Sequence, residues 1–158
     1  MTDNYIGIMI ESLRRKRDVL TDILKLSEEQ SLLLDDPNLE PDTFEKNVNR
    51  KAALIDKLEQ LDTGFESLYD KVKEELESNK EIHKDQIRQM QELIRALTEL
   101  NMQIQATEAR NKEKATAKFA YIRQQAKEIR SSQKIVKEYY NNMMHKAYNE
   151  PHFLDNKK

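Results

Sequence analysis

The side chains best suited to metal binding or proton transfer are three histidines and two pairs of adjacent glutamates. His83, His145 and His152 lie far apart in the sequence, and none has a second ligand type at the spacing that a metal site requires. The pairs Glu28–Glu29 and Glu74–Glu75 point to different sides of their predicted helices, so neither can act as a facing acid–base pair. We interpret all these groups as solvated surface residues. The sequence therefore predicts no catalytic residue, no metal site, no cofactor and no enzymatic activity.

Basic residues offer a second kind of chemistry, the binding of nucleic acid or anionic lipid. The run Arg14–Arg17 is flanked by Glu11 and Asp18, and Asp22 follows one turn later, so we expect an ion-paired helix face there. Residues 111–158 carry 11 Lys and Arg against 5 Asp and Glu. These cations are dispersed around a predicted helix, without aromatic interleaving or a known nucleic-acid-binding motif. We expect a solvated face or an acidic protein partner, and no nucleic acid.

The composition is typical of long amphipathic helices. Of the 158 residues, 35% are charged and 37% hydrophobic, with two glycines, three prolines and no tryptophan. The absence of cysteine excludes disulfides and agrees with a reducing cytoplasm. The first ten residues lack the basic start and apolar run of a signal peptide, and no stretch reaches the ~20 apolar residues of a membrane span. We expect one all-α domain in the cytoplasm, without membrane insertion.

Two helices are predicted in the first half of the chain. The first runs from a cap near Asp3 to about Leu34, and the prolines and acidic residues of 35–41 end it and reverse the chain. The second follows an N-cap at Asp42 and runs to about Leu76. Their apolar stripes contain Ile6, Met9, Ile10, Leu13, Leu20, Ile23, Leu24 and Leu32 to Leu34, then Phe44, Val48, Ile55, Leu58, Leu61, Phe65, Leu68, Tyr69, Val72 and Leu76. We expect antiparallel packing of the two helices.

The longest periodic segment runs from Glu81 to about Tyr148 and contains no proline or glycine. At 1.5 Å per residue it would form a helix about 100 Å long, roughly twice the length of each preceding helix. A capping box at Ser78–Glu81 is the only signal that separates it from the second helix. We expect a tight antiparallel turn there, and a continuous helix from residue 43 onward is the competing interpretation.

The distal half of this long helix would have no intramolecular partner if the three helices pack side by side. Its apolar stripe would then lie in water, which soluble proteins seldom tolerate without a use for it. Aromatic residues and methionines suit a groove that accepts an amphipathic helix of a partner. The candidate binding residues are Phe119, Ile122, Ala126, Ile129, Val136, Tyr140 and Met143. Folding back onto the bundle or pairing in a homodimer would explain the same stripe equally well.

The segment Lys51–Asp62 has the pattern K-x-x-L-I-x-x-L-x-x-L-D and is followed by the pair Gly64–Phe65. Near the C-terminus, Tyr148 is followed by the sequence FLDNKK at 153–158. These motifs resemble those of the flagellar export chaperones of the FlgN type. The Leu-Asn-x-x-Asn element of the family is present only in degraded form, as Leu100–Ile104 and then Arg110–Asn111. The subgroup, and with it the cargo, therefore stays open.

The resemblance implies a cytoplasmic chaperone of bacterial flagellum biogenesis. Such a chaperone binds the amphipathic terminal helices of flagellar hook-associated proteins, prevents their premature assembly, and delivers them to the gate or ATPase components of the flagellar type III export apparatus. The resemblance also implies that a C-terminal tyrosine contacts the export gate, and Tyr139, Tyr140 and Tyr148 are equal candidates. The alternatives are a chaperone of the filament-cap protein and a homodimeric coiled-coil scaffold without cargo.

The predicted architecture is all-α, an elongated antiparallel helical hairpin or three-helix bundle with a long C-terminal helix. Residues 1–148 are expected to form a single FlgN-like helical domain. Residues 149–158 are expected to form a flexible tail, because Pro151 breaks the helix and little apolar area remains to be buried.

Overall fold

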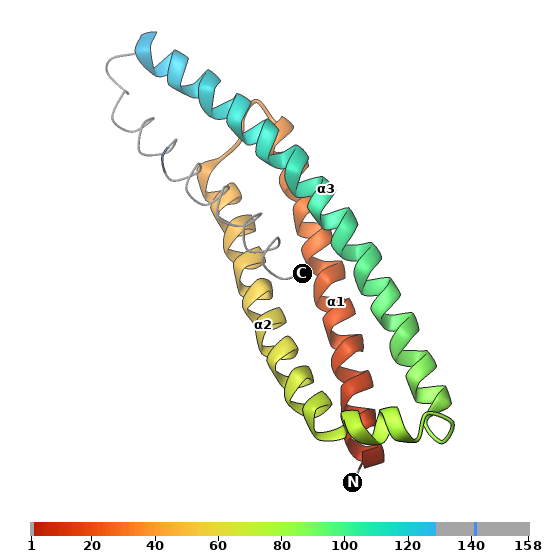
Figure 1. Cartoon of the computed structure of the whole chain (residues 1–158). Helices are drawn as coiled ribbons and strands as arrows, with labels where there is room; N and C mark the ends of the chain where they lie inside the picture. Colours follow the sequence, from red (N-terminus) through yellow and green to blue (C-terminus); the bar gives the residue numbers. More distant parts are fainter. Residues whose placement is uncertain (1, 129–140, 142–158) are drawn as a thin grey trace. The chain divides into compact units, whose positions relative to one another are not determined.

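The computed structural model describes residues 2–128 and 141. These residues form three α-helices, α1 (Thr2–Asp35), α2 (Pro41–Ser78) and α3 (Lys84–Glu128), and no strand occurs among them (Figure 1). The helices pack against one another, so the predicted all-α three-helix bundle is confirmed. None of the helices among the described residues is both long and apolar enough to cross a membrane.

The chain divides into two compact units, and each helix contributes a segment to both. The first unit contains Met1–Asp22 and Asp56–Met102. The second unit contains Ile23–Ile55 and the described residues from Gln103 onward. Each unit has its own buried residues, and the two are described separately below.

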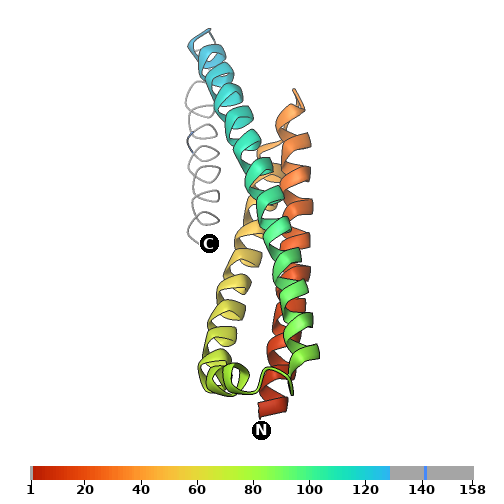
Figure 2. The ribbon, with the colours of Figure 1, turned by 45° about the vertical axis from the view of Figure 1, so that its right-hand side comes forward.

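In the first unit, apolar residues of the three helical segments form the core. The buried residues are Ile6, Met9, Ile10, Leu13, Val19 and Leu20 in α1, Leu58, Val72 and Leu76 in α2, and Met90, Leu93 and Leu97 in α3. Lys16 interrupts the stripe of α1 at a position where an apolar residue was due, and its Nζ donates to Oδ1 of Asp62 on α2 at 2.6 Å. The last part of α2 bends away from the preceding turns and runs toward the start of α3 (Figure 2).

The second unit has a core of the same kind. Its buried apolar residues are Ile23, Leu26 and Leu34 in α1, Leu39 in the following loop, Phe44, Val48 and Ile55 in α2, and Ile104, Ala115 and Phe119 in α3. Most of these lie on the predicted stripes, as helical periodicity requires. Leu32, which was included in the predicted stripe, is instead 72% exposed.

The start of α2 differs from the prediction. Asp42 was expected to cap the helix, but the helix begins at Pro41, and the backbone amide of Phe44 donates to the carbonyl of Glu40 at 3.2 Å. The ring of Pro41 fixes φ near the helical value and needs no acceptor for an amide proton, so proline suits the first helical position. The predicted cap at Asp42 is therefore wrong.

The turn between α2 and α3 covers residues 79–83. The predicted break is confirmed and the continuous helix is wrong, although Ser78 ends α2 and does not cap α3. The carbonyl of His83 instead accepts the amide of Ile87 at 2.9 Å and closes the first turn of α3. His83 is buried, with Nε2 3.4 Å from Oε1 of Glu75 and Nδ1 3.7 Å from Oδ1 of Asp3, so its interpretation as a solvated surface residue is also wrong.

Several predictions for the C-terminal part lie outside the described residues. They are the continuation of the third helix from 129 to 148 and the flexible tail over 149–158. The single domain over residues 1–148 also stays a prediction.

The buried leucine at position 58 gives a test of the antiparallel packing in the first unit. Leu58→Ala should lower the free energy of unfolding by about 2–5 kcal/mol, because it removes buried methyl groups and leaves a cavity. Urea denaturation followed by circular dichroism measures this change. Leu32→Ala is the control, since its exposed side chain should change stability by no more than about 0.5 kcal/mol. Equal denaturation midpoints for the two variants would refute the packing.

Gly64 gives a test of the helix itself. It lies inside α2, and a Cβ atom added to it would meet no other atom within 4 Å. Close packing therefore does not require a glycine here. Gly64→Ala should raise the free energy of unfolding by about 0.5–1 kcal/mol, because alanine has the higher helix propensity. A lower thermal midpoint for this variant would contradict that view and would show that the glycine is needed for the path of α2.

Candidate functional site

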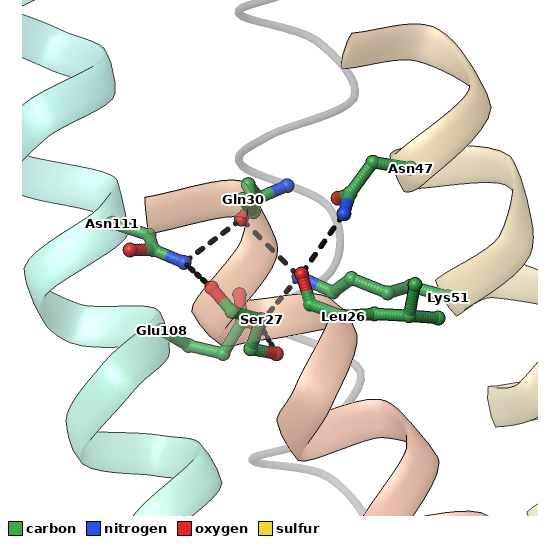
Figure 3. Close-up of polar contacts among 7 residues, drawn as sticks. All are labelled: Leu26, Ser27, Gln30, Asn47, Lys51, Glu108 and Asn111. Atoms are coloured by element: carbon green, nitrogen blue, oxygen red, sulfur yellow. Dashed lines mark hydrogen bonds and ion pairs between the residues drawn. The ribbon is translucent and has the colours of Figure 1, made fainter. Parts of the chain in front are cut away.

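In the second unit, polar residues occupy positions that the helical spacing reserves for the core. Lys51, for example, follows Val48 by three residues and precedes Ile55 by four. The buried polar residues of this group are Ser27 and Gln30 in α1, Asn47 and Lys51 in α2, and Glu108 and Asn111 in α3. Figure 3 shows that the six side chains converge between the three helices. We call them the buried polar network.

The centre of the buried polar network is an ion pair between Lys51 and Glu108, which are 0% and 3% exposed. The ammonium group of Lys51 donates to Oε1 of Glu108 and, at 3.2 Å, to Oε1 of Gln30. The hydroxyl of Ser27 donates to the same glutamate oxygen at 2.5 Å. One carboxylate oxygen thus connects α1, α2 and α3 (Figure 3).

Two asparagines extend the buried polar network to the backbone of α1. Nδ2 of Asn111 donates to the carbonyl of Ser27 at 2.8 Å and to Oε1 of Gln30 at 3.1 Å. Nδ2 of Asn47 donates to the carbonyl of Leu26 at 2.9 Å. These contacts form only when the helices have one particular axial register, because sliding a helix by one residue moves its polar groups by about 1.5 Å and turns them by about 100°.

The buried polar network is not fully satisfied by the described residues. Nε2 of Gln30, Oδ1 of Asn47 and Oδ1 of Asn111 are buried and have no hydrogen-bond partner there. An unpaired buried polar group costs about 1–3 kcal/mol. The network is therefore better explained as a determinant of helix register than as a source of stability. It positions α3, and its groups are withdrawn from solvent.

Toward the C-terminal end of α3, an apolar cluster follows the buried polar network. It contains Leu34, Leu39, Phe44, Val48, Ala115 and Phe119, with Leu33 packed against it. Phe119 is 0% exposed. The expectation that Phe119 lies on an exposed stripe is therefore wrong, because α1, α2 and the loop between them cover it.

Beyond this cluster, the side chains of α3 become accessible. Ile122 is half-buried and lines a hollow of about 630 Å³ together with Pro37, Leu39 and Tyr121. Tyr121 is well exposed and was missed by the sequence analysis, although an aromatic residue next to a predicted binding position is a usable signal. Ala126 belongs to α3, but its side chain is not described.

The remaining predicted site residues lie outside the described part of the chain. They are Ile129, Val136, Tyr140 and Met143 of the predicted cargo surface and Tyr139, Tyr140 and Tyr148 of the predicted export-gate contact.

Part of the positive charge of the C-terminal segment has a structural role. Lys114 Nζ donates to Oγ of Ser31 at 2.7 Å and to Oδ2 of Asp35 at 2.9 Å. Lys118 Nζ donates to the carbonyl of Asp36 at 2.7 Å. No basic residue lies in the last turn of α1, so these two lysines of α3 provide the cations that the negative end of a helix dipole favours.

Three amphipathic helices held in register by internal polar contacts define an all-α protein built for helix–helix contacts. Residues 1–148 match the FlgN protein family, and the chain belongs to that family. The family is one of chaperones rather than enzymes, and membership gives the chain the role of an export chaperone in flagellar assembly. No curated protein and no solved structure matches the chain.

The buried ion pair gives a test by a double-mutant cycle. Lys51→Met and Glu108→Leu should each lower the free energy of unfolding by about 3–5 kcal/mol, because each leaves a buried charge without its partner. The double variant should be within about 1 kcal/mol of the wild type or more stable, since neither charge remains. Urea denaturation of the four proteins gives the coupling energy. Additive losses in the double variant would show that the two charges do not depend on each other.

Proposed function

We propose that this chaperone binds the amphipathic terminal helices of flagellar hook-associated proteins, prevents their premature assembly and delivers them to the flagellar type III export apparatus in the cytoplasm. Membership of the FlgN protein family over residues 1–148 is the observation that carries the proposal. The apolar pattern of the chain after Phe119 supports it.

The proposed cargo surface begins where the described core ends. Phe119 is buried in the core of the second unit, so we do not assign it to cargo binding. Ile122 is the first residue of the stripe that keeps part of its side chain in solvent. The stripe continues in the sequence at helical spacing through Ala126, Ile129, Val136, Tyr140 and Met143. We assign cargo binding to these residues.

Burial of apolar area is the proposed source of affinity. An amphipathic cargo helix that self-assembles through its apolar face would be blocked if the same face were covered by the chaperone. Since Lys114 and Lys118 are bound within the chain, we assign contacts with acidic side chains of the cargo to the basic residues from Arg130 onward in the sequence. Charges at the edge of a binding surface mainly raise the association rate and select the partner.

Delivery to the export apparatus requires a second contact. We assign it to one of Tyr139, Tyr140 and Tyr148, because a tyrosine combines a rigid apolar ring with a hydrogen-bonding hydroxyl. Replacement of each by alanine in motile cells, with secretion of hook-associated proteins as the readout, would identify which of the three is used.

The substitution Ile129→Asp tests the cargo surface. It should weaken binding of a peptide from the C-terminal helix of a hook-associated protein by about two decades or more, because a carboxylate would be buried without a partner. The thermal midpoint should stay near that of the wild type. Isothermal titration calorimetry and a thermal melt of the same variant measure the two effects.

Two further variants provide the controls. Phe119→Ala should lower stability by about 3–5 kcal/mol as a core change. Ile82→Asp, at an exposed position of the α2–α3 turn, should change neither stability nor binding. Collapse of the fold or of a dimer in Ile129→Asp would mean that the stripe is a core or homodimer seam. Binding of a filament-cap peptide in place of the hook-associated one would indicate the other flagellar cargo.

A further inference from the structure

The first unit contains an apolar groove that the proposed function does not use. It has a volume of about 480 Å³ and lies between α2 and α3, with buried Met9 of α1 among its lining residues. The other main apolar lining residues are Phe65, Tyr69 and Leu76 of α2 and Ile87, Met90 and Ile94 of α3. Ile94 is 47% exposed, and Tyr69 is also exposed, so part of the apolar lining of the groove is accessible to a partner. Methionine side chains adapt to the shape of a partner, and an apolar groove accepts the apolar face of an amphipathic helix.

The α3 edge of the groove is basic. Gln91 lines the groove, and Arg88 and Arg95 precede and follow it by three and four residues, so the three side chains share one face of the helix. Lys84 lies one turn before Arg88 on the same face, and Lys80 lines the groove from the preceding turn. Arg88 and Arg95 are exposed, and neither forms an ion pair with another residue in the described part of the chain.

The α2 edge of the groove is acidic. Glu77 lines the groove, and Glu66, Asp70 and Lys73 fall on the same face of α2 at helical spacing. Lys73 is 3.9 Å from Asp70, so the single cation of this row is paired within it. The groove therefore has a negative rim on one side and a positive rim on the other.

We propose that this groove binds an amphipathic helix of a second protein, distinct from the export cargo. The partner helix would place an apolar face on Tyr69 and Ile94. It would have a row of acidic residues against the α3 edge and a row of basic residues against the α2 edge. Reversing the direction of a helix in a groove exchanges its two flanks, so the opposite charges of the rims select one of the two directions.

Designed peptides test this proposal with the full chain. Each peptide has about 18 residues, enough to span about 27 Å as a helix. All share one apolar face; the first has one glutamate flank and one lysine flank, the second has lysine on both flanks, and the third has glutamate on both. Fluorescence anisotropy should show the first peptide binding the wild type at least about tenfold more tightly than the others, a difference of about 1.4 kcal/mol.

Two variants examine the apolar contact and the charged rim. Ile94→Glu should weaken the first peptide about tenfold or more. Met102→Glu is the matched control, because Met102 is 63% exposed in the same unit and on the same helix but does not line the groove. Arg88→Glu combined with Arg95→Glu removes the net positive charge of the α3 edge, because the two new carboxylates offset Lys80 and Lys84. The preference of this variant for the first peptide over the lysine-flanked peptide should therefore be lost.

Several results would overturn the proposal. They are equal binding of all three peptides, no binding by the wild type, and unchanged binding by Ile94→Glu. A wild-type dimer in sedimentation that Ile94→Glu dissociates would show that a second copy of the chain covers the groove. Ile94→Glu should still bind the hook-associated peptide. If Ile94→Glu loses binding of that peptide, the groove is the cargo site itself. If Ile129→Asp leaves binding of the hook-associated peptide unchanged, the proposed cargo surface is wrong and the proposal for the groove is unaffected.

Discussion

The ion pair between Lys51 and Glu108 is the constraint on which the second unit depends. Two charges withdrawn from water are tolerated only when they meet each other and enough hydrogen-bonding groups. Ser27 and Gln30 supply those groups from α1, so the pair requires all three helices at one level. Apolar side chains alone would tolerate several helix registers at similar energy, whereas a displaced lysine or glutamate would be buried without a partner. The unsatisfied amides nearby indicate that this selectivity reduces stability.

Helical periodicity predicted the fold but not this network. Apolar residues such as Leu20, Leu58 and Leu97 recur at core spacing and are buried. Their burial follows from residue type and helical spacing, because the hydrophobic effect needs no specific partner. Lys51 and Glu108 also have core spacing, but charged residues are almost never buried without a partner, and their partners come from other helices. His83 was misjudged for the same reason, since its acidic neighbours Asp3 and Glu75 come from α1 and α2.

The predicted stripe of cargo-binding residues begins at Phe119, which belongs to the core of the second unit. The long third helix suggested that everything beyond the shorter helices would be exposed. The loop after α1 instead brings Leu39 over Phe119, which a comparison of helix lengths cannot anticipate. Lys114 and Lys118 were likewise expected in solvent or against a partner, yet they bind the end of α1. The end of the described core along α3 could be located only from contacts between segments that are distant in the sequence.

The sequence separation within the buried polar network has a consequence for synthesis on the ribosome. Lys51 and Glu108 are 57 positions apart in the sequence, and the contacts of Ser27 with Glu108 and Asn111 span 81 and 84 positions. Domains tend to fold as they emerge, N-terminal parts first. A nascent chain that ends before residue 108 has the lysine but not its carboxylate. The second unit can therefore close only after most of α3 has been translated, and the α1–α2 hairpin must stay soluble until then.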